Sequence, residues 1–244
     1  MWQSLISIDK HWDNSYKYIL SRLNMEKALS YAIENTANRY LIHVASATNY
    51  KTVIDDIVAE TLLMHFKYEF LSSRIRLNNN SVLNIALLSA LIYSDKSHEK
   101  SVIMKILWKI QGYSIDALYD FRLGELKSNW QEVSDLVNSM LHANHSACDI
   151  YSLIEFILDM SEEDKPELEV YSNNGDITIR NLDNNCVIDI PYLSDKNPIN
   201  IMTALFSANP SKIYLANSVL NNEMECILNN IIETAPINMK ILEQ

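Results

Sequence analysis

Three residues between positions 142 and 148 have side chains that could hold a metal ion. His142, His145 and Cys148 offer two imidazoles and a thiol, which zinc and other transition metals prefer as ligands. On an unbroken helix the two histidines share a face and Cys148 points away, so chelation needs a break near Asn144. Structural zinc sites usually have four ligands at matched spacing, and the alternative is a polar loop between two helices. Both interpretations stay open.

A second candidate is an arginine placed among apolar residues. Apolar side chains from Ile115 to Trp130 recur at helical spacing, and Arg122 falls on the stripe that they form. A guanidinium in that position could bind an anion or a partner, with Phe121 beside it. The alternative is a structural ion pair, because buried charges are normally paired. The carboxylates that could form such a pair are Glu60, Glu69 and Asp116.

The C-terminal third has polar residues where parallel sheets bind ligands, just after the strands end. Asp195 and Asn197 precede one predicted helix, and Asn217 and Ser218 precede the next. The N-terminus of a helix can hold an anion, but helix capping explains the same residue types. The pattern therefore indicates contacts to a ligand or partner at most.

Catalytic motifs that depend on glycine do not occur in this chain. Its three glycines are Gly112, Gly124 and Gly175, and none forms part of a phosphate loop or a nucleophile elbow. Both motifs need glycine because the backbone must approach its ligand closely or turn sharply. We therefore predict no catalytic residue and no cofactor, and the sequence leans against an enzyme.

Composition restricts the possible partners. The chain has 244 residues, nearly half of them hydrophobic, and a formal net charge of −11. Binding to nucleic acid needs clustered Lys and Arg, so an acidic chain is not expected to bind it. No apolar stretch reaches the roughly 20 residues that span a bilayer. Three widely separated cysteines argue against a disulfide framework. We expect a cytoplasmic protein whose partner is another protein, in an oligomeric state that the sequence leaves open.

The fold class predicted for the whole chain is α+β or mixed α/β, with a mostly helical N-terminal two-thirds. Residues 1–50 are predicted to form a small α/β element. It begins with a strand at Trp2–Ile8 and a helix from Trp12 to Leu23. A second helical stretch is expected at Leu29–Ile33, followed by a strand at Tyr40–Ala45.

Residues 51–160 are predicted to form a helical bundle. Its first helix carries one continuous apolar stripe from Ile54 to Ile75, on which His65 is expected to be a core or boundary residue with satisfied hydrogen bonds. The next helices are expected at Val82–Tyr93 and from Val102 to Ile110, the second ended by Gly112. A long helix then runs from Ser114 to Met140, and a last one from Cys148 to Met160.

Residues 166–244 are predicted to form a separate module with the order β-β-β-α-β-α-β. Its strands are expected around residues 168–170, 177–179, 186–190, 211–216 and 237–242. An Asn-Gly turn at Asn174-Gly175 connects the first two strands, and Leu168 and Val170 are expected to face inward. Helical crossovers favour parallel neighbours, so the last strands are expected to be parallel.

Two stretches resemble the YtxC-like putative sporulation proteins of endospore-forming bacteria. The first contains Phe121, Arg122 and Leu123, which are similar to the phenylalanine-arginine-leucine segment of that family. The second runs from Asn200 to Ile213, where a short helix, a proline turn and an apolar strand occur in the family's order. The similarity extends roughly from Val53 to the C-terminus. It implies a role in sporulation and no particular activity.

Three functions are consistent with these observations. The leading hypothesis is a non-catalytic, sporulation-associated protein that acts through contacts with other proteins. One alternative is an enzyme or small-ligand-binding protein with a site between the helical bundle and the C-terminal sheet. Another is an acidic inhibitor that mimics nucleic acid, which would need a continuous acidic face.

Overall fold

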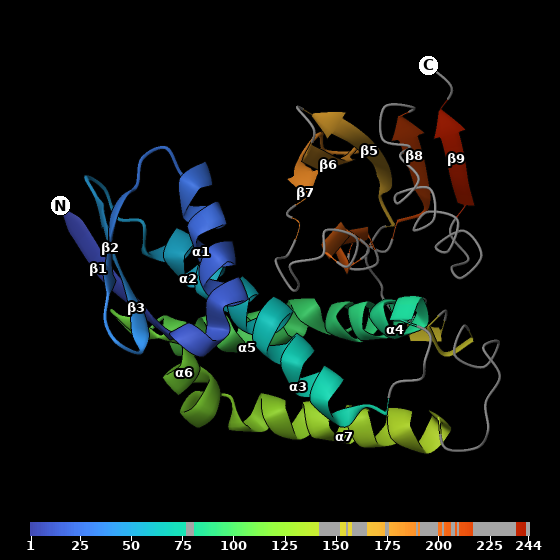
Figure 1. Cartoon of the computed structure of the whole chain (residues 1–244), viewed down its shortest axis with the longest axis horizontal. Helices are drawn as coiled ribbons and strands as arrows, with labels where there is room; N and C mark the ends of the chain where they lie inside the picture. The colour runs from blue at the N-terminus through green and yellow to red at the C-terminus, as the bar shows by residue number, and fades with distance from the viewer. Residues whose placement is uncertain are drawn as a thin grey trace. The chain divides into compact units, whose positions relative to one another are not determined.

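The structure is a computed structural model, and it shows a mixed α/β protein (Figure 1). It describes residues 1–76, 81–141, 152–154, 156–157, 165–173, 176–188, 190, 200–201, 203–205, 208, 210–216 and 238–242. The chain divides into two compact units. Unit 1 contains Met1–Arg74 and Lys96–Ser134, and unit 2 contains Ile75–Asp95 and Asp135–Gln244. The division predicted at residues 51 and 166 stays a prediction.

Unit 1 begins with a four-stranded sheet, sheet A. Its strands are β1 (Trp2–Asp9), β2 (Ser30–Asn35), β3 (Arg39–Ser46) and β4 (Tyr113–Ser114). They lie in the order β2-β3-β1-β4. Strand β3 is antiparallel to both of its neighbours, whereas β4 is parallel to β1. The strands predicted at Trp2–Ile8 and Tyr40–Ala45 are confirmed.

The helix predicted at Leu29–Ile33 is wrong, because this stretch forms strand β2. Six consecutive residues of β2 pair with β3, from Ser30 opposite Ala45 to Asn35 opposite Tyr40. Tyrosine and isoleucine favour strands when a neighbouring strand is available, and that long-range pairing overrides the local helical pattern. The sequence also did not predict the short strand β4.

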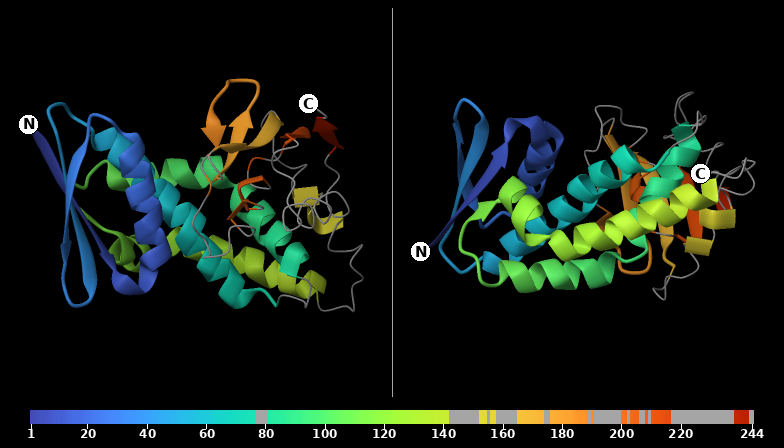
Figure 2. Two further views of the ribbon diagram at one scale, coloured as in Figure 1. Left: turned by 45° about the horizontal axis from the view of Figure 1, so that its top comes forward. Right: turned by 90° about the horizontal axis from the view of Figure 1, so that it is seen from below.

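Helices cover one face of sheet A. In Figure 2 the described helices of unit 1 lie on one side of the sheet, and none of them lies on the other. On the covered face, Ile6, Ile8, Ile42 and Val44 are at most 2% exposed. A short 3₁₀ turn and the helices of this unit are Lys10–Trp12, α1 (Asp13–Met25), α2 (Lys51–Thr61), α3 (Lys67–Arg74), α5 (Lys96–Leu107), α6 (Ile115–Arg122) and α7 (Gly124–Leu141), the last of which runs on into unit 2.

The predicted helix from Ile54 to Ile75 is interrupted by a π-turn. Residues Leu62–Phe66, between α2 and α3, form one turn of π-helix, and all five side chains are buried. Such turns are rare and occur mostly as single-turn insertions in α-helices. The stretch is therefore helical, as predicted, but its apolar stripe is not continuous at one period.

Two helix ends differ from the sequence-based prediction. Helix α5 ends at Leu107, and Ile110 N–H donates to the carbonyl oxygen of Leu107 in the following turn. Gly112 therefore lies beyond the end of the helix and does not cap it. The long helix predicted from Ser114 breaks at Leu123, whose φ of −99° and ψ of 26° lie outside helical values.

Unit 2 contains the apolar helix α4 (Ser81–Tyr93) and a five-stranded sheet, sheet B. The helix was predicted with little polar face, and its residues from Ile85 to Ile92 are indeed buried. Among the residues described, no helix of the chain is long and apolar enough to cross a membrane.

Sheet B has the strand order β7-β6-β5-β8-β9. The strands are β5 (Glu167–Asn173), β6 (Asp176–Asn181), β7 (Val187–Ile188), β8 (Lys212–Ala216) and β9 (Asn238–Leu242). The first three are antiparallel, and β5, β8 and β9 are mutually parallel. This confirms the predicted strands and the parallel arrangement of the last ones. The helix predicted before β8 is seen at residues 200–201 and 203–205, and the one predicted after it lies outside the described residues.

Candidate functional site

One face of sheet A is not covered by the described helices of unit 1. It carries alternate residues of the strands, because successive side chains point to opposite faces. Gln3, Leu5, Ala32 and His43 are exposed there, whereas the neighbours Ile6, Ile42 and Val44 are buried under the helices. Sheets with one covered face normally place polar residues on the other. Leu5 is 37% exposed, so this face is apolar in part.

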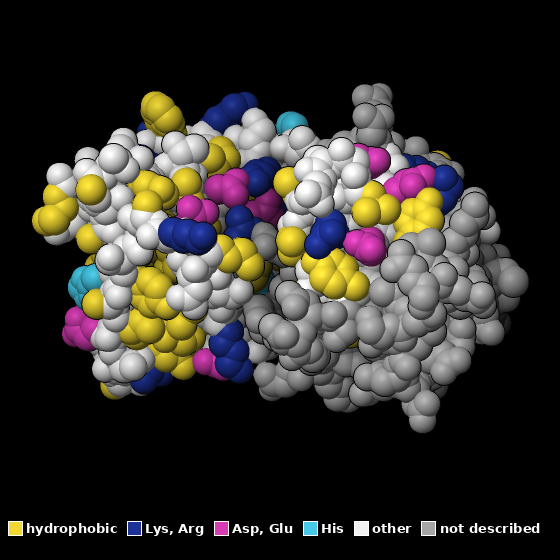
Figure 3. All heavy atoms as spheres, turned by 90° about the horizontal axis from the view of Figure 1, so that it is seen from above, with side chains coloured by type: hydrophobic (Ala, Val, Ile, Leu, Met, Phe, Trp, Pro, Cys, Tyr) yellow, Lys and Arg dark blue, Asp and Glu magenta, His cyan; other side chains and the backbone are white. Residues whose placement is uncertain are grey.

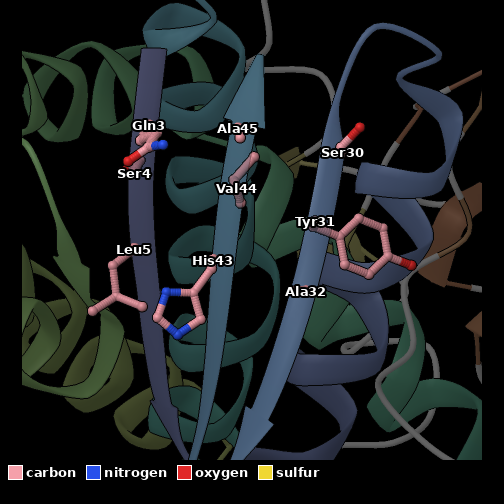
Figure 4. Close-up of a pocket in the computed structure, with 9 residues that line it drawn as sticks. All are labelled: Gln3, Ser4, Leu5, Ser30, Tyr31, Ala32, His43, Val44 and Ala45. Atoms are coloured by element: carbon pink, nitrogen blue, oxygen red, sulfur yellow. The ribbon is translucent and has the colours of Figure 1, made fainter. Parts of the chain in front are cut away.

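A groove of about 620 Å³ crosses this face. Figure 4 shows its lining on β1, β3 and β2, with the side chains of Leu5 and His43 next to each other on adjacent strands. The two residues are direct partners in the strand register. The residues that line it are Gln3, Ser4, Leu5, Ser30, Tyr31, Ala32, His43, Val44 and Ala45. This open face of sheet A is our candidate site.

Several polar side chains that line the groove are already bound to other residues. His43 Nε2 lies 3.3 Å from Glu34 Oε2, and both side chains are more than half exposed. The Ser4 hydroxyl donates to the Gln111 carbonyl oxygen and the Tyr31 hydroxyl donates to Asn24 Oδ1. Neither hydroxyl is hydrogen-bonded to the imidazole, which activation of a nucleophile would require.

At one end of the same face, Arg39 of β3 binds side chains of β1 and α6. Arg39 Nε donates to the Ser7 hydroxyl at 2.7 Å, and its two terminal nitrogens donate to the Asp116 carboxylate at 3.0 and 2.6 Å. The hydrogen bond to Asp116 raises the pKa of Arg39. A bidentate pair of this kind has a defined geometry. It connects β1, β3 and α6, so the open face has a rigid support.

Two buried charge clusters hold the covering helices. Asp55 on α2 accepts a hydrogen bond from the Tyr113 hydroxyl of β4 and is 2.8 Å from Lys51 Nζ. Burial, and then the hydrogen bond to Asp55, raises the pKa of Tyr113. Because the carboxylate is satisfied by both partners, the cluster joins α2 to sheet A and has no free group for chemistry.

The second buried cluster joins α3, α5 and α7. Lys67 Nζ lies 2.7 Å from Glu99 Oε2, and the Trp130 indole donates to Glu99 Oε1 at 2.6 Å. The charged side chains of Lys67 and Glu99 are each 4% exposed. Removing one partner of such a pair leaves a buried charge without compensation, so the pair fixes how the helices pack.

Acidic residues on α2 are interleaved with basic ones. Glu60 binds Lys96 at 3.0 Å and Lys100 at 2.7 Å, and Lys100 also binds Asp56 at 2.6 Å. Burial alone would raise the pKa of Glu60, but the two lysines outweigh it and hold the pKa below its usual value. Figure 3 likewise shows Lys and Arg side chains among the Asp and Glu of one face. A mixed surface does not favour a nucleic-acid mimic.

His65 is a core residue, but one of its two ring nitrogens is not satisfied. It lies in the π-turn at 4% exposure, and its Nε2 has no hydrogen-bond partner among the described residues. The ring contacts Tyr18, with 4.9 Å between the ring centroids. Burial lowers the pKa of His65 to about 3. The imidazole is therefore neutral near pH 7, and the prediction of a satisfied histidine is wrong.

The predicted buried ion pair of Arg122 is also wrong. Arg122 is exposed, because the break at Leu123 shifts the apolar stripe and Leu123 takes the inward position at 1% exposure. Two of the carboxylates proposed as its partners bind other cations, Glu60 the lysines of α5 and Asp116 Arg39. Phe121 is 82% exposed, so the hypothesis of a partner contact at Phe121 and Arg122 stays a prediction.

The remaining predicted site residues lie outside the described residues. They are the metal candidates His142, His145 and Cys148 and the strand-end residues Asp195, Asn197, Asn217 and Ser218. Within the parts of the chain that are described, no group of three or more His, Cys, Asp or Glu side chains could hold a metal ion.

Comparisons with known proteins do not add a family. No protein-family model matches the chain, and neither the curated proteins nor the solved structures contain a match. The resemblance to the YtxC-like proteins therefore stays a prediction from the sequence.

The groove residues were not predicted from the sequence. The available signal was the alternation in β1 and β3, where Ile6, Ile8, Ile42 and Val44 alternate with Leu5, Ser7 and His43. That alternation predicts a sheet with one exposed face. It does not place the three strands side by side, which the groove requires.

Proposed function

We propose that this chain is a non-catalytic binding protein that takes up a partner protein on the open face of sheet A. The observation that carries the proposal is a sheet with helices on one face only, whose other face has an open groove of about 620 Å³. Sites of this shape suit another protein surface better than a small molecule, which is usually held in an enclosed pocket.

The composition of the face supports a protein partner. Leu5, Ala32 and Ala45 supply apolar area, while Gln3 and the pair of His43 and Glu34 supply hydrogen-bonding groups. Interfaces between proteins combine an apolar centre with a polar rim in this way. We further propose a cytoplasmic location and a role in sporulation, which rest on the sequence and its resemblance to the YtxC-like family alone.

The test is affinity purification of the tagged chain from its own cells, comparing two matched lysine substitutions. Leu5→Lys places a charge in the groove, and Ser128→Lys places one at an exposed position of α7. We expect partners bound by the parent and by Ser128→Lys to be lost from Leu5→Lys, with unchanged thermal stability in all three. Retention of the same partners by Leu5→Lys would overturn the proposal.

A further inference from the structure

Strand β2 is an exposed edge of sheet A. It is the first strand in the order β2-β3-β1-β4, so no strand among the described residues lies on one side of its backbone. Five of its six residues are exposed, including Ile33 at 39%, and only Tyr31 is partly covered. Both faces of β2 are therefore accessible, together with the unpaired N–H and C=O groups along its outer side.

Nothing in the sequence of β2 blocks the addition of another strand. Proteins usually protect such edges with lysine, proline, a β-bulge or a very short strand. The sequence Ser-Tyr-Ala-Ile-Glu-Asn has neither lysine nor proline, and Glu34 is its one charged residue. Its six pairs with β3 are consecutive, so no bulge twists the edge away. The other edge of the sheet, β4, is only two residues long.

We propose that β2 pairs antiparallel with β2 of a second copy of this chain, with the two-fold axis at Ala32. Along a β-strand, the backbone N–H and C=O groups of alternate residues point to the same edge of the strand. In an antiparallel pair, a residue whose backbone groups point to the new neighbour must lie opposite another such residue. An axis through Ala32 meets this condition. It pairs Tyr31 with Ile33 of the second copy and Ser30 with Glu34 of the second copy, and each pair occurs twice.

The side chains of β2 suit this register. An aromatic residue opposite a β-branched one is among the favourable cross-strand pairs, and here the symmetry supplies two of them. The small side chain of Ala32 lies at the axis, where the two copies are closest. Each Glu34 lies opposite a serine, so no like charges face each other. A net charge of −11 on each copy is screened beyond about 8 Å at physiological ionic strength.

The consequence is a continuous eight-stranded sheet with one open face. Each copy contributes the four strands of sheet A, and the two grooves lie on the same side of the joined sheet. The pairing uses the edge of β2, and the proposed partner site uses the face of β1 and β3. The dimer therefore does not depend on the proposed function, and Leu5→Lys should leave it intact.

The first test is the solution mass of the full chain, measured by sedimentation or light scattering over a concentration series. We expect a dimer for the parent and half that mass for Ile33→Lys, which places lysine on the edge strand. The matched control is Gln3→Lys, an exposed substitution on β1, which should remain dimeric. A monomeric parent at its highest soluble concentration, or a dimeric Ile33→Lys, would overturn the proposal.

The second test is disulfide cross-linking, which reads the register directly. At the axis the Cα atoms of Ala32 and its copy are about 4.5–5.5 Å apart, within the range that a disulfide bridges. Ala32→Cys should give a dimer that reductant separates. Ser30→Cys should not, because its own copy is four residues along the ladder, about 14 Å away. The parent gives the baseline for the natural cysteines, of which Cys186 is exposed. Equal cross-linking of all three proteins would contradict the register.

Discussion

Sheets A and B differ in how the charged and polar side chains on their outer faces pair with one another. On sheet B, Lys212 and Tyr214 of β8 both bind the Glu167 carboxylate of β5. One strand further, Arg180 of β6 donates to the Tyr171 hydroxyl at 2.8 Å and lies 3.6 Å from Glu169. On the open face of sheet A, His43 and Glu34 form a charge pair at the groove, and Arg39 and Asp116 form another at one end of the face.

The difference supports our proposal that a partner binds on sheet A rather than on sheet B. Cross-strand pairs on sheet B use its charged groups internally, so a partner would have to break them before it could bind those groups. The groove of sheet A exposes apolar side chains and keeps few internal pairs. The inner faces of the two sheets are alike, because both are built from buried Ile, Leu and Val.

The largest expected effect is a difference in stability between substitutions on the covered face and on the open face of sheet A. Ile42 is fully buried on the covered face, so Ile42→Ala should lower the free energy of unfolding by about 2–5 kcal/mol. Leu5→Ala on the open face should lower it by less than about 1 kcal/mol, because Leu5 already contacts water. Unfolding in urea measures both. Similar losses for the two variants would mean that the open face is part of the core.

The second effect is a pH dependence of stability that comes from the buried His65 of unit 1. The pKa of His65 is about 3 in the folded state and 6.5 in the unfolded state, so the unfolded chain binds more protons between these values. The contribution of His65 to the free energy of unfolding is therefore fully present above pH 6.5, and it decreases as the pH falls towards 3. Between pH 7 and pH 5 the loss from this residue is about 2 kcal/mol.

His65→Phe keeps an aromatic ring against Tyr18 and removes this titration. Urea unfolding at pH 7 and pH 5 should show a smaller loss for His65→Phe than for the parent, and carboxylates common to both proteins cancel in the comparison. Equal pH dependence in the two proteins would show that folding does not lower the pKa of His65.

A smaller effect tests whether the charge pairs of sheet B are structural. Arg180→Met removes the contacts to Tyr171 and Glu169, and the cost should be up to about 1 kcal/mol, because partly exposed pairs contribute little. Arg122→Met is the matched control at an exposed arginine for which the structure shows no hydrogen bond or ion pair to the described residues. Urea unfolding of both variants checks the difference. A loss for Arg122→Met as large as that for Arg180→Met would count against the pairs.

The smallest effect is expected for the charge pair of the groove. Glu34→Gln should change the free energy of unfolding by less than about 0.5 kcal/mol, since Glu34 and His43 are both more than half exposed. The same variant should bind partners less well if the pair takes part in recognition. Stability can be measured in urea and binding by the affinity purification described above. A large loss of stability would show that the pair holds β2 on β3.

Much of the fold could be predicted because its elements are marked locally. The strands of sheet B are bounded by Asn, Asp and Pro, and alternation identified Leu168 and Val170 as inward-facing residues. Strand β2 could not be predicted, because its strand conformation depends on pairing with β3. The break at Leu123 was missed for a similar reason, since the apolar spacing on either side of it fits a single helix.

The candidate site could not be predicted, since it depends on which face the helices cover. Leu5 and His43 are 38 positions apart in the chain and become neighbours only through the register of β1 and β3. Residues chosen for their chemistry gave a different list. Of that list the structure describes Phe121 and Arg122, both exposed on α6.

The π-turn at Leu62–Phe66 also affects how this sequence tolerates changes in length. A π-turn adds one residue to a helical turn, so deletion of one residue there would restore a regular α-helix. Because the extra residue is contained within that one turn, the residues on either side would keep their faces of the helix, with Phe70 and Leu71 in the core. Lys67 would still reach Glu99. Homologous chains that lose this single residue should therefore keep the buried charges at positions 67 and 99.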